Sequence, residues 1–208
     1  MMEVIRMNIE HFSLDRFKRG TKQSCQLTIV HRSSDGTQTE TDLPVFVLTG
    51  LQQGPVLLVL AGVHGDEYEG MQTVLKLFHD LTADQLRGRL VMIPTANPLA
   101  YRGKTRESPE DGLNLARVFP GKLAGAMTER LAYELHHRFI ASADFLLDLH
   151  SGGVHYEIAL LTGYYHNESS ELGRRSRAAA EAFGIPLLWG HETTAPGRSI
   201  SSAQMLGI

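Results

Sequence analysis

Residues 55–67 read PVLLVLAGVHGDE, and this stretch decides the fold. The nearly unbroken apolar run from Pro55 to Ala61 is typical of a central strand that is covered on both faces. The run ends at Gly62, and the chain then places four apolar residues at helical spacing: Met71, Val74, Leu75 and Phe78. The sequence therefore predicts a buried strand, a tight turn, and a helix that packs one face on the sheet.

Strands and helices alternate on both sides of this stretch. Apolar runs predict strands over Gln26–His31, Pro44–Leu48, Arg89–Pro94, Ala143–Leu149 and Ile158–Leu161. Helical patterns cover Leu123–Ile140 and Glu168–Phe183, and Gly184 stops the second. The Asp-Gly chemistry of Ser33-Ser34-Asp35-Gly36 predicts a turn, so a short β-hairpin leads the fold. Together these elements indicate an α/β sheet with helices on both faces.

Composition indicates one globular domain. The 208 residues are 42% hydrophobic and 21% charged, and we expect a leading β region over 1–50 and an α/β core over 51–208. A net charge of -3 with scattered arginines argues against a nucleic-acid partner. No apolar run approaches the roughly 20 residues that a bilayer requires, and the start shows no signal pattern. We therefore expect a cytoplasmic protein without a membrane partner, in which the single Cys25 is structural.

Two of the predicted strands end in histidine. His64 follows the first strand, Glu67 lies at the start of the next helix, and His150 follows the Phe145–Leu149 run. Because the carboxyl ends of such strands meet at one edge of a sheet, these side chains can converge. Two histidines and a glutamate, with the fourth position left to water, are typical of a catalytic zinc site, and Asp148 is placed to orient a neighbouring group. The competing interpretation is that each histidine is only part of the hydrogen-bonded structure, but a second strand-end histidine favours the metal site.

Five segments, taken in chain order, resemble a known family. They are HGDE at 64–67, Asn97-Pro98, Thr105-Arg106, DGLNLARVFPG at 111–121 and DLHS at 148–151. The set resembles the succinylglutamate desuccinylase/aspartoacylase family, which belongs with the zinc carboxypeptidases. The resemblance runs from about Pro55 to the end of the sequence. It implies a mixed sheet of the zinc carboxypeptidase type.

The resemblance also implies roles for individual residues. The two histidines and the glutamate already identified would bind one zinc ion. Arg106 would polarise the scissile carbonyl and stabilise its oxyanion, while Arg117, with Asn114 nearby, would bind the substrate carboxylate. Guanidinium groups suit both tasks, because they pair with carboxylates and stabilise charge that develops on oxygen. Without the resemblance, each arginine is better interpreted as a solvated loop charge.

The sequence departs from the family pattern at two places. The family's Asp-Leu-Asn-Arg is here Asn114-Leu115-Ala116-Arg117, so Ala116 replaces an asparagine. Either the substrate differs, or Asn114 supplies an amide from a shifted position. The family's general base is a glutamate on a strand that would follow Ile208, and we interpret Met205–Ile208 as the lead-in to that strand. The general base is thus expected outside residues 1–208.

The resemblance implies a zinc-dependent deacylase that hydrolyses the amide of a small N-acyl amino acid or a related N-acyl amine. A metallocarboxypeptidase shares the same ligands, and a non-catalytic metal-binding module follows if the general base is lacking. The acyl group and the amino acid stay open. So does the oligomeric state, for which the free edge of the leading hairpin is a candidate contact.

Overall fold

The computed structural model describes residues 4–32 and 36–208. Its main element is a sheet of six strands in the order β1-β2-β3-β5-β4-β6. Their bounds are β1 Val4–Asn8, β2 Thr21–Arg32, β3 Gln38–Thr49, β4 Gln52–Ala61, β5 Arg87–Ile93 and β6 Phe145–Leu149. Strand β3 runs antiparallel to both of its neighbours, β2 and β5, whereas β5, β4 and β6 are parallel to one another. The sheet is therefore mixed, as predicted.

The leading hairpin is present and long. Strands β2 and β3 pair without interruption from Thr21 opposite Thr49 to Arg32 opposite Gln38. The predicted turn at Ser33-Ser34-Asp35-Gly36 falls mainly on residues 33–35, which lie outside the described residues. Strand β1 adds to the hairpin as a parallel edge strand.

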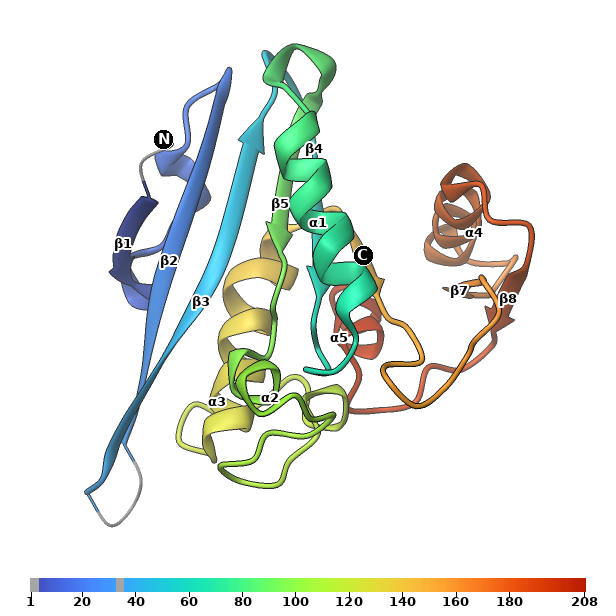
Figure 1. Ribbon diagram of the computed structural model, residues 1–208. Helices are drawn as coiled ribbons and strands as arrows, with labels where there is room; N and C mark the ends of the chain where they lie inside the picture. The colour runs from blue at the N-terminus through green and yellow to red at the C-terminus, as the bar shows by residue number, and fades with distance from the viewer. Residues whose placement is uncertain (1–3, 33–35) are drawn as a thin grey trace.

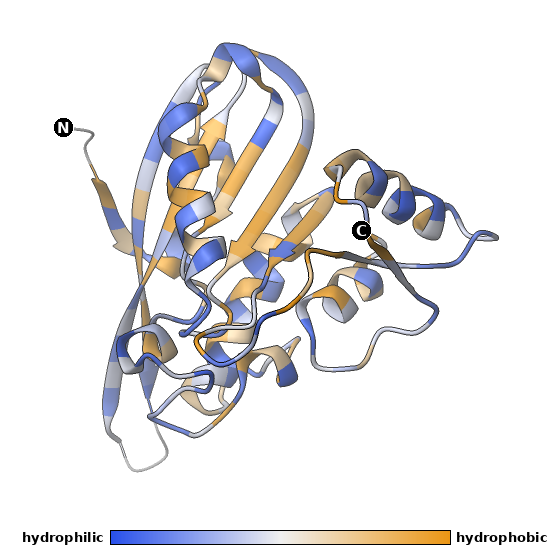
Figure 2. Ribbon diagram, turned by 45° about the vertical axis from the view of Figure 1, so that its right-hand side comes forward, coloured by the Kyte–Doolittle hydropathy of each residue, from blue (hydrophilic) through white to orange (hydrophobic). Residues whose placement is uncertain are grey.

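Helices cover both faces of the sheet (Figure 1). Alternate residues of β4 show this, because Leu58 and Leu60 belong to the core under α3, whereas Val59 and Ala61 pack with α1. Figure 2 shows the resulting apolar colouring of the central strands behind α1. The helices are α1 Tyr68–Asp80, α2 Pro98–Gly103, α3 Met127–Glu134, α4 Glu171–Phe183 and α5 Ser199–Leu206. Leu75, expected on the buried face of α1, is 45% exposed, so the buried stripe is narrower than predicted.

Several short helical turns link these elements. They are 3₁₀ turns at Ile9–His11, Leu14–Arg16, Ala83–Gln85, Leu115–Arg117 and Ile140–Ser142, and a π-helical segment at Leu135–Phe139. The predicted helix Leu123–Ile140 is therefore three pieces, and its α-helical part begins at Met127. The predicted helix from Glu168 begins instead at Glu171, because the Ser170 hydroxyl accepts the Gly173 N–H and caps it. It ends at Phe183, as predicted.

The prediction of a strand at Ile158–Leu161 is wrong. The strand of this region is β7, Thr162–Tyr165, and it pairs in parallel with β8, Leu188–His191. Ile158 and Leu160 are 57% and 79% exposed, so an apolar pattern alone did not identify the paired residues. With α4, the two strands form a small unit set apart from the six-stranded sheet (Figure 1).

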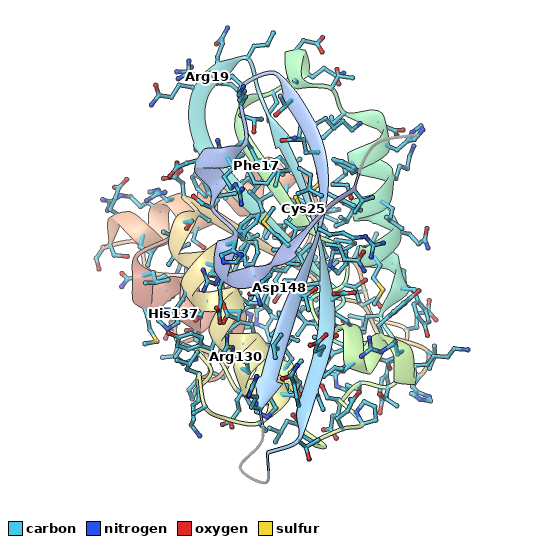
Figure 3. The ribbon with its side chains drawn as sticks, turned by 90° about the vertical axis from the view of Figure 1, so that its left-hand side faces the viewer. Phe17, Arg19, Cys25, Arg130, His137 and Asp148 are labelled. Atoms are coloured by element: carbon cyan, nitrogen blue, oxygen red, sulfur yellow. The ribbon has the colours of Figure 1, made fainter. Side chains whose placement is uncertain are left out.

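Two further features bear on the expectations above. Met205 and Leu206, interpreted as the lead-in to a strand, are the last residues of α5, which Gly207 closes with a φ of 78°. Cys25 lies buried on β2, and this burial raises the pKa of its thiol to about 11 (Figure 3). Within the described ranges, no helix is long and apolar enough to cross a bilayer.

Candidate metal centre

The pairing of β4 with β6 brings the two strand-end histidines together. Ala61 lies opposite Leu149 in the parallel register, so the segments that leave the two strands start side by side. His64 and His150 stand with ring centroids 5.1 Å apart. Glu67 lies between them, and one potential ligand atom from each of the three residues falls within 4.8 Å of the others. The structure thus assembles the three predicted ligands at one point.

Close backbone packing forms the turn that carries His64. Gly62 has a φ of 64°, and its carbonyl accepts the Asn97 N–H at 2.8 Å, which ties the turn to the exit of β5. Gly65 donates its N–H to the Thr105 carbonyl at 2.9 Å. A Cβ at Gly65 would lie 2.0 Å from the carbonyl carbon of Ala100 in α2. The ligand turn and α2 therefore touch backbone to backbone, and this position requires glycine.

The carboxylate of Glu67 is the centre of the site. It is buried, and its two oxygens lie 2.8 Å from Nδ1 of His64 and 2.8 Å from Nδ1 of His150. Arg106 donates to one oxygen at 3.0 Å and the Ser151 N–H donates to the other at 3.1 Å. Burial opposes ionisation, but the hydrogen bonds from His150 and His64 outweigh it and hold the pKa of Glu67 well below its usual range. The carboxylate is therefore charged at neutral pH.

The second nitrogen of each imidazole also faces an acceptor. Nε2 of His64 lies 3.2 Å from Oδ1 of Asn114, and Nε2 of His150 lies 3.3 Å from Oδ2 of Asp148. Metal-binding histidines usually donate their outer N–H in this way, which fixes the tautomer and the ring orientation. Both Nδ1 atoms then face the Glu67 carboxylate. This donor set of two imidazole nitrogens and a carboxylate fits a divalent cation such as zinc.

Asp148 and His150 interact strongly. Burial opposes the charge on Asp148, but the neighbouring His150 outweighs it and keeps the pKa of Asp148 lowered. Burial likewise opposes the charge on His150, yet the carboxylates of Asp148 and Glu67 raise the pKa of His150 to about 10. In the metal-free protein the ring is therefore protonated between two carboxylates. A position that retains a proton so firmly is one that favours positive charge.

The predicted substrate residues lie on one segment beside the ligands. Asn114 caps the 3₁₀ turn Leu115–Arg117 by accepting the Ala116 N–H at 2.9 Å, and the same oxygen faces His64. The Asn114 amide oxygen thus contacts a predicted metal ligand, a contact that the sequence did not indicate. Arg117 exposes its guanidinium and donates from Nη1 to the Ala116 carbonyl at 2.8 Å. The Ala116 side chain joins the hydrophobic core.

A buried polar network anchors this segment. Oδ1 of Asn97 accepts from the Ala100 N–H and from the Ser108 hydroxyl, at 3.1 and 3.2 Å. The Thr128 hydroxyl, at the start of α3, lies 2.7 Å from the Ser108 hydroxyl and 2.9 Å from Oδ1 of Asp111. Residues 104–114 contain no helix or strand, so these bonds supply the order that regular structure would give. The Asn97-Pro98 and Asp111-Gly112 motifs thus hold the Arg106 loop in place.

Sequence reasoning missed two contributors to the site, Ser151 and Ser199. The Ser151 N–H binds Glu67, and the Ser151 hydroxyl donates to Glu69 at 2.6 Å. The hydroxyl of Ser199, far along the chain in α5, donates to Asp148. Ser151 follows directly on the DLH motif, so its proximity could have been expected. Ser199 carries no sequence signal of a role.

Comparison with known proteins places the chain in a family. The model of the succinylglutamate desuccinylase/aspartoacylase catalytic domain matches residues 53–208. The chain belongs to this family. A succinylglutamate desuccinylase/aspartoacylase from Rhodobacter sphaeroides is 30% identical, with a TM-score of 0.83 over 95% of this chain and 58% of that one. The ectoine utilization protein EutE (DoeB) from Ruegeria pomeroyi, in a product-bound structure, is 27% identical, with a TM-score of 0.77 over 91% of this chain and 58% of that one.

A curated relative is also similar within the matched region. The N-alpha-acetyl-L-2,4-diaminobutyric acid deacetylase of Halomonas elongata is 39% identical over 134 residues, which are 64% of this chain and 39% of the relative. The chain thus spans less than two thirds of the length of each of these three relatives. The family and its fold are those that the sequence motifs predicted.

Proposed function

We propose that this chain binds zinc as part of an amide hydrolase that acts on small N-acyl amino acids. The observation that carries the proposal is the convergence of His64, Glu67 and His150 at one point, with an acceptor behind each imidazole. Two histidines and a glutamate are the ligand set of catalytic zinc sites that leave a fourth position open. Bound zinc would lower the pKa of a water molecule to about 7 and polarise a carbonyl.

The side chains around the ligands suit the deacylation of an amino acid. The Arg106 side chain is 49% exposed while one of its nitrogens contacts Glu67, so the guanidinium reaches both the metal centre and solvent. We assign it the stabilisation of the oxyanion that forms from the scissile carbonyl. The exposed guanidinium of Arg117 is assigned to the substrate carboxylate, which it can bind through two parallel hydrogen bonds.

The general base is assigned to a glutamate outside residues 1–208, as the family pattern implies. Three carboxylates around the imidazoles are already engaged: Glu67 with both imidazoles, Asp148 with His150 and Glu69 with Ser151. A carboxylate fixed by such contacts is a poor proton shuttle, because proton transfer would break the hydrogen bonds that order the site. In this scheme the described residues hold the metal and orient the substrate.

The substrate class follows from the similarity to the Halomonas deacetylase. That protein removes an acetyl group from N-alpha-acetyl-L-2,4-diaminobutyric acid, as its name states. We propose an N-acetylated small amino acid for this chain as well. The family's asparagine is replaced by Ala116 here, and this replacement argues against N-acetylaspartate as the substrate.

Metal analysis and a substrate panel test the proposal. We expect about one zinc per chain in the parent, loss of zinc in His64→Ala, and retention in His79→Ala, whose ring on α1 is 88% exposed. Hydrolysis is measured on N-acetyl amino acids and on C-terminally free peptides, using a form that extends past residue 208. Release of acetate from N-acetyl-2,4-diaminobutyrate supports the deacylase. Release of C-terminal amino acids would identify a carboxypeptidase, and stoichiometric zinc without turnover would identify a metal-binding module.

A further inference from the structure

The Asp148 carboxylate has a second partner besides His150. Ser199, the first residue of α5, is 3% exposed and donates its hydroxyl to Oδ2 of Asp148. The same oxygen lies 3.3 Å from Nε2 of His150. A chain of contacts therefore runs from α5 through Asp148 to the imidazole at the metal centre. In the view of Figure 3, Asp148 lies in the interior of the molecule, behind strands β1 to β3.

The Ser199 hydroxyl has no part in capping its own helix. The residue before α5 is Arg198, whose N–H donates to the Ser201 hydroxyl at 3.1 Å, and Ser201 donates back to the Arg198 carbonyl at 2.7 Å. Ser201 thus serves the helix end. The buried hydroxyl of Ser199 points to a carboxylate in β6, which is a different element of the fold.

The two imidazoles differ in how firmly packing holds them. The His64 side chain is 2% exposed, so its neighbours fix the ring on all sides. The His150 side chain is 38% exposed and depends more on its polar contacts. Oδ1 of Asp148 is buried and has no hydrogen-bond partner among the described residues, so Oδ2 carries the contacts that set the carboxylate's rotation.

The segment before Ser199 is itself fixed against the substrate side of the site. The Gly197 carbonyl accepts the Phe119 N–H at 3.1 Å. Gly197 has a φ of 81°, and a Cβ there would lie 2.3 Å from the Arg117 carbonyl oxygen. Residues 197–199 therefore contact the backbone of the Arg117 turn on one side and Asp148 on the other.

We propose that Ser199 is a positioning residue, which holds Asp148 so that the carboxylate fixes the His150 ring for metal binding. The inference rests on the metal site of the proposed function. A hydroxyl that donates to Oδ2 occupies one lone pair and leaves the other directed at the imidazole N–H. Without the hydroxyl, Asp148 is free to rotate and the His150 ring loses its fixed orientation. Mutation of a residue that hydrogen-bonds a metal ligand directly typically lowers metal affinity by about 10- to 100-fold.

The test compares two buried serines of the same helix. Ser202 is 1% exposed, one turn from Ser199, and its hydroxyl contacts Nδ1 of His136 at 2.5 Å instead of Asp148. Ser199→Ala, Ser199→Thr and Ser202→Ala are each titrated with Zn²⁺ against a chelator of known affinity, and the Co²⁺ absorption spectrum reports the ligand geometry. Thermal unfolding of the metal-free forms measures any general loss of stability.

We expect Ser199→Ala to weaken zinc binding by about tenfold, the lower end of the range for direct partners, and to shift the Co²⁺ spectrum. Ser199→Thr, which keeps the hydroxyl, should restore much of the affinity. Ser202→Ala should bind like the parent even if its unfolding temperature falls. Parent-like affinity in Ser199→Ala, or equal weakening in Ser202→Ala, would overturn the inference while leaving the proposed function intact. A parent that binds no zinc would overturn both.

Discussion

Gly65→Ala is expected to disrupt the metal centre without changing a ligand. The added Cβ would lie 2.0 Å from the carbonyl carbon, 2.2 Å from the oxygen of Ala100 and 2.3 Å from the Tyr101 nitrogen. All three atoms are backbone, so no side-chain rotation relieves the contact. An ordinary carbon–carbon contact is about 3.5 Å, and the ligand turn and α2 would therefore have to separate by about 1.5 Å.

Such a displacement acts on the site directly, because Gly65 lies between His64 and Glu67. The side chains of a catalytic or binding site must lie within about 0.5 Å of their productive positions. A misplacement of about 1 Å costs about 100-fold in a catalytic site, and we expect a loss of zinc affinity of that order. Overpacking also destabilises the fold by about 1–3 kcal/mol, here toward the upper end because the contact is between two backbones.

The assay pairs chelator competition for zinc with thermal unfolding of the metal-free protein. Gly184→Ala is the matched control, since this glycine has a φ of 80° and nothing lies within 4 Å of the added Cβ. It should lose about 1 kcal/mol through backbone strain and keep its zinc affinity. Parent-like zinc affinity in Gly65→Ala would refute the reasoning, because the turn would then have absorbed the collision without moving its ligands.

Three further outcomes are expected. Burial and the nearby His137 lower the pKa of His136, so as the pH drops below 6.5 the unfolded chain is protonated before the folded protein and the free energy of unfolding should fall. His136→Gln should reduce this dependence of the unfolding free energy on pH, as measured by urea unfolding. Cys25, whose pKa burial raises to about 11, should react with iodoacetamide only after unfolding. Glu134→Ala should cost about 3–5 kcal/mol by chemical denaturation, because this buried carboxylate pairs with Arg130 of α3 and with Arg138 of the following π-helical segment. Glu129→Ala, which removes a more exposed ion pair with Lys122, should cost under about 1 kcal/mol.

The strands beneath the site could be predicted from their apolar runs, although β6 is an edge strand of half-buried residues and is not covered on both faces. The run at 55–61 is apolar throughout, and the run at 143–149 is apolar except at Asp144 and Asp148. Both runs form parallel strands that end side by side. The region after the second run is different. Its apolar residues at 158 and 160 are exposed, and the true strand begins at Thr162, where its partner Leu188 lies 26 residues further along the chain. Pairing of that kind depends on the tertiary fold and leaves no local signal.

The predicted helix boundaries were wrong for local structural reasons. Residues 123–140 have the apolar spacing of a helix, but the α-helix begins only at Met127, after Gly125 and Ala126. At this start the Glu129 side chain accepts the Ala126 N–H at 3.0 Å. The segment then widens to a π-helix at Leu135, where the apolar period alone cannot distinguish helix types. Residues 199–206 combine three serines with four apolar side chains, a composition that predicts no helix, yet they form α5.

Asn114 shows what spacing can and cannot predict about a site. Its place in the family segment predicted a residue near the substrate, whereas the structure shows its amide oxygen against His64. The two imidazoles are thereby supported unequally, one by a neutral amide and the other by the Asp148 carboxylate. A carboxylate acceptor makes its histidine the more basic ligand. His150 should consequently be the stronger electron-pair donor to the metal. Because Ser199 of α5 positions Asp148, this distant part of the chain acts on the metal centre through His150.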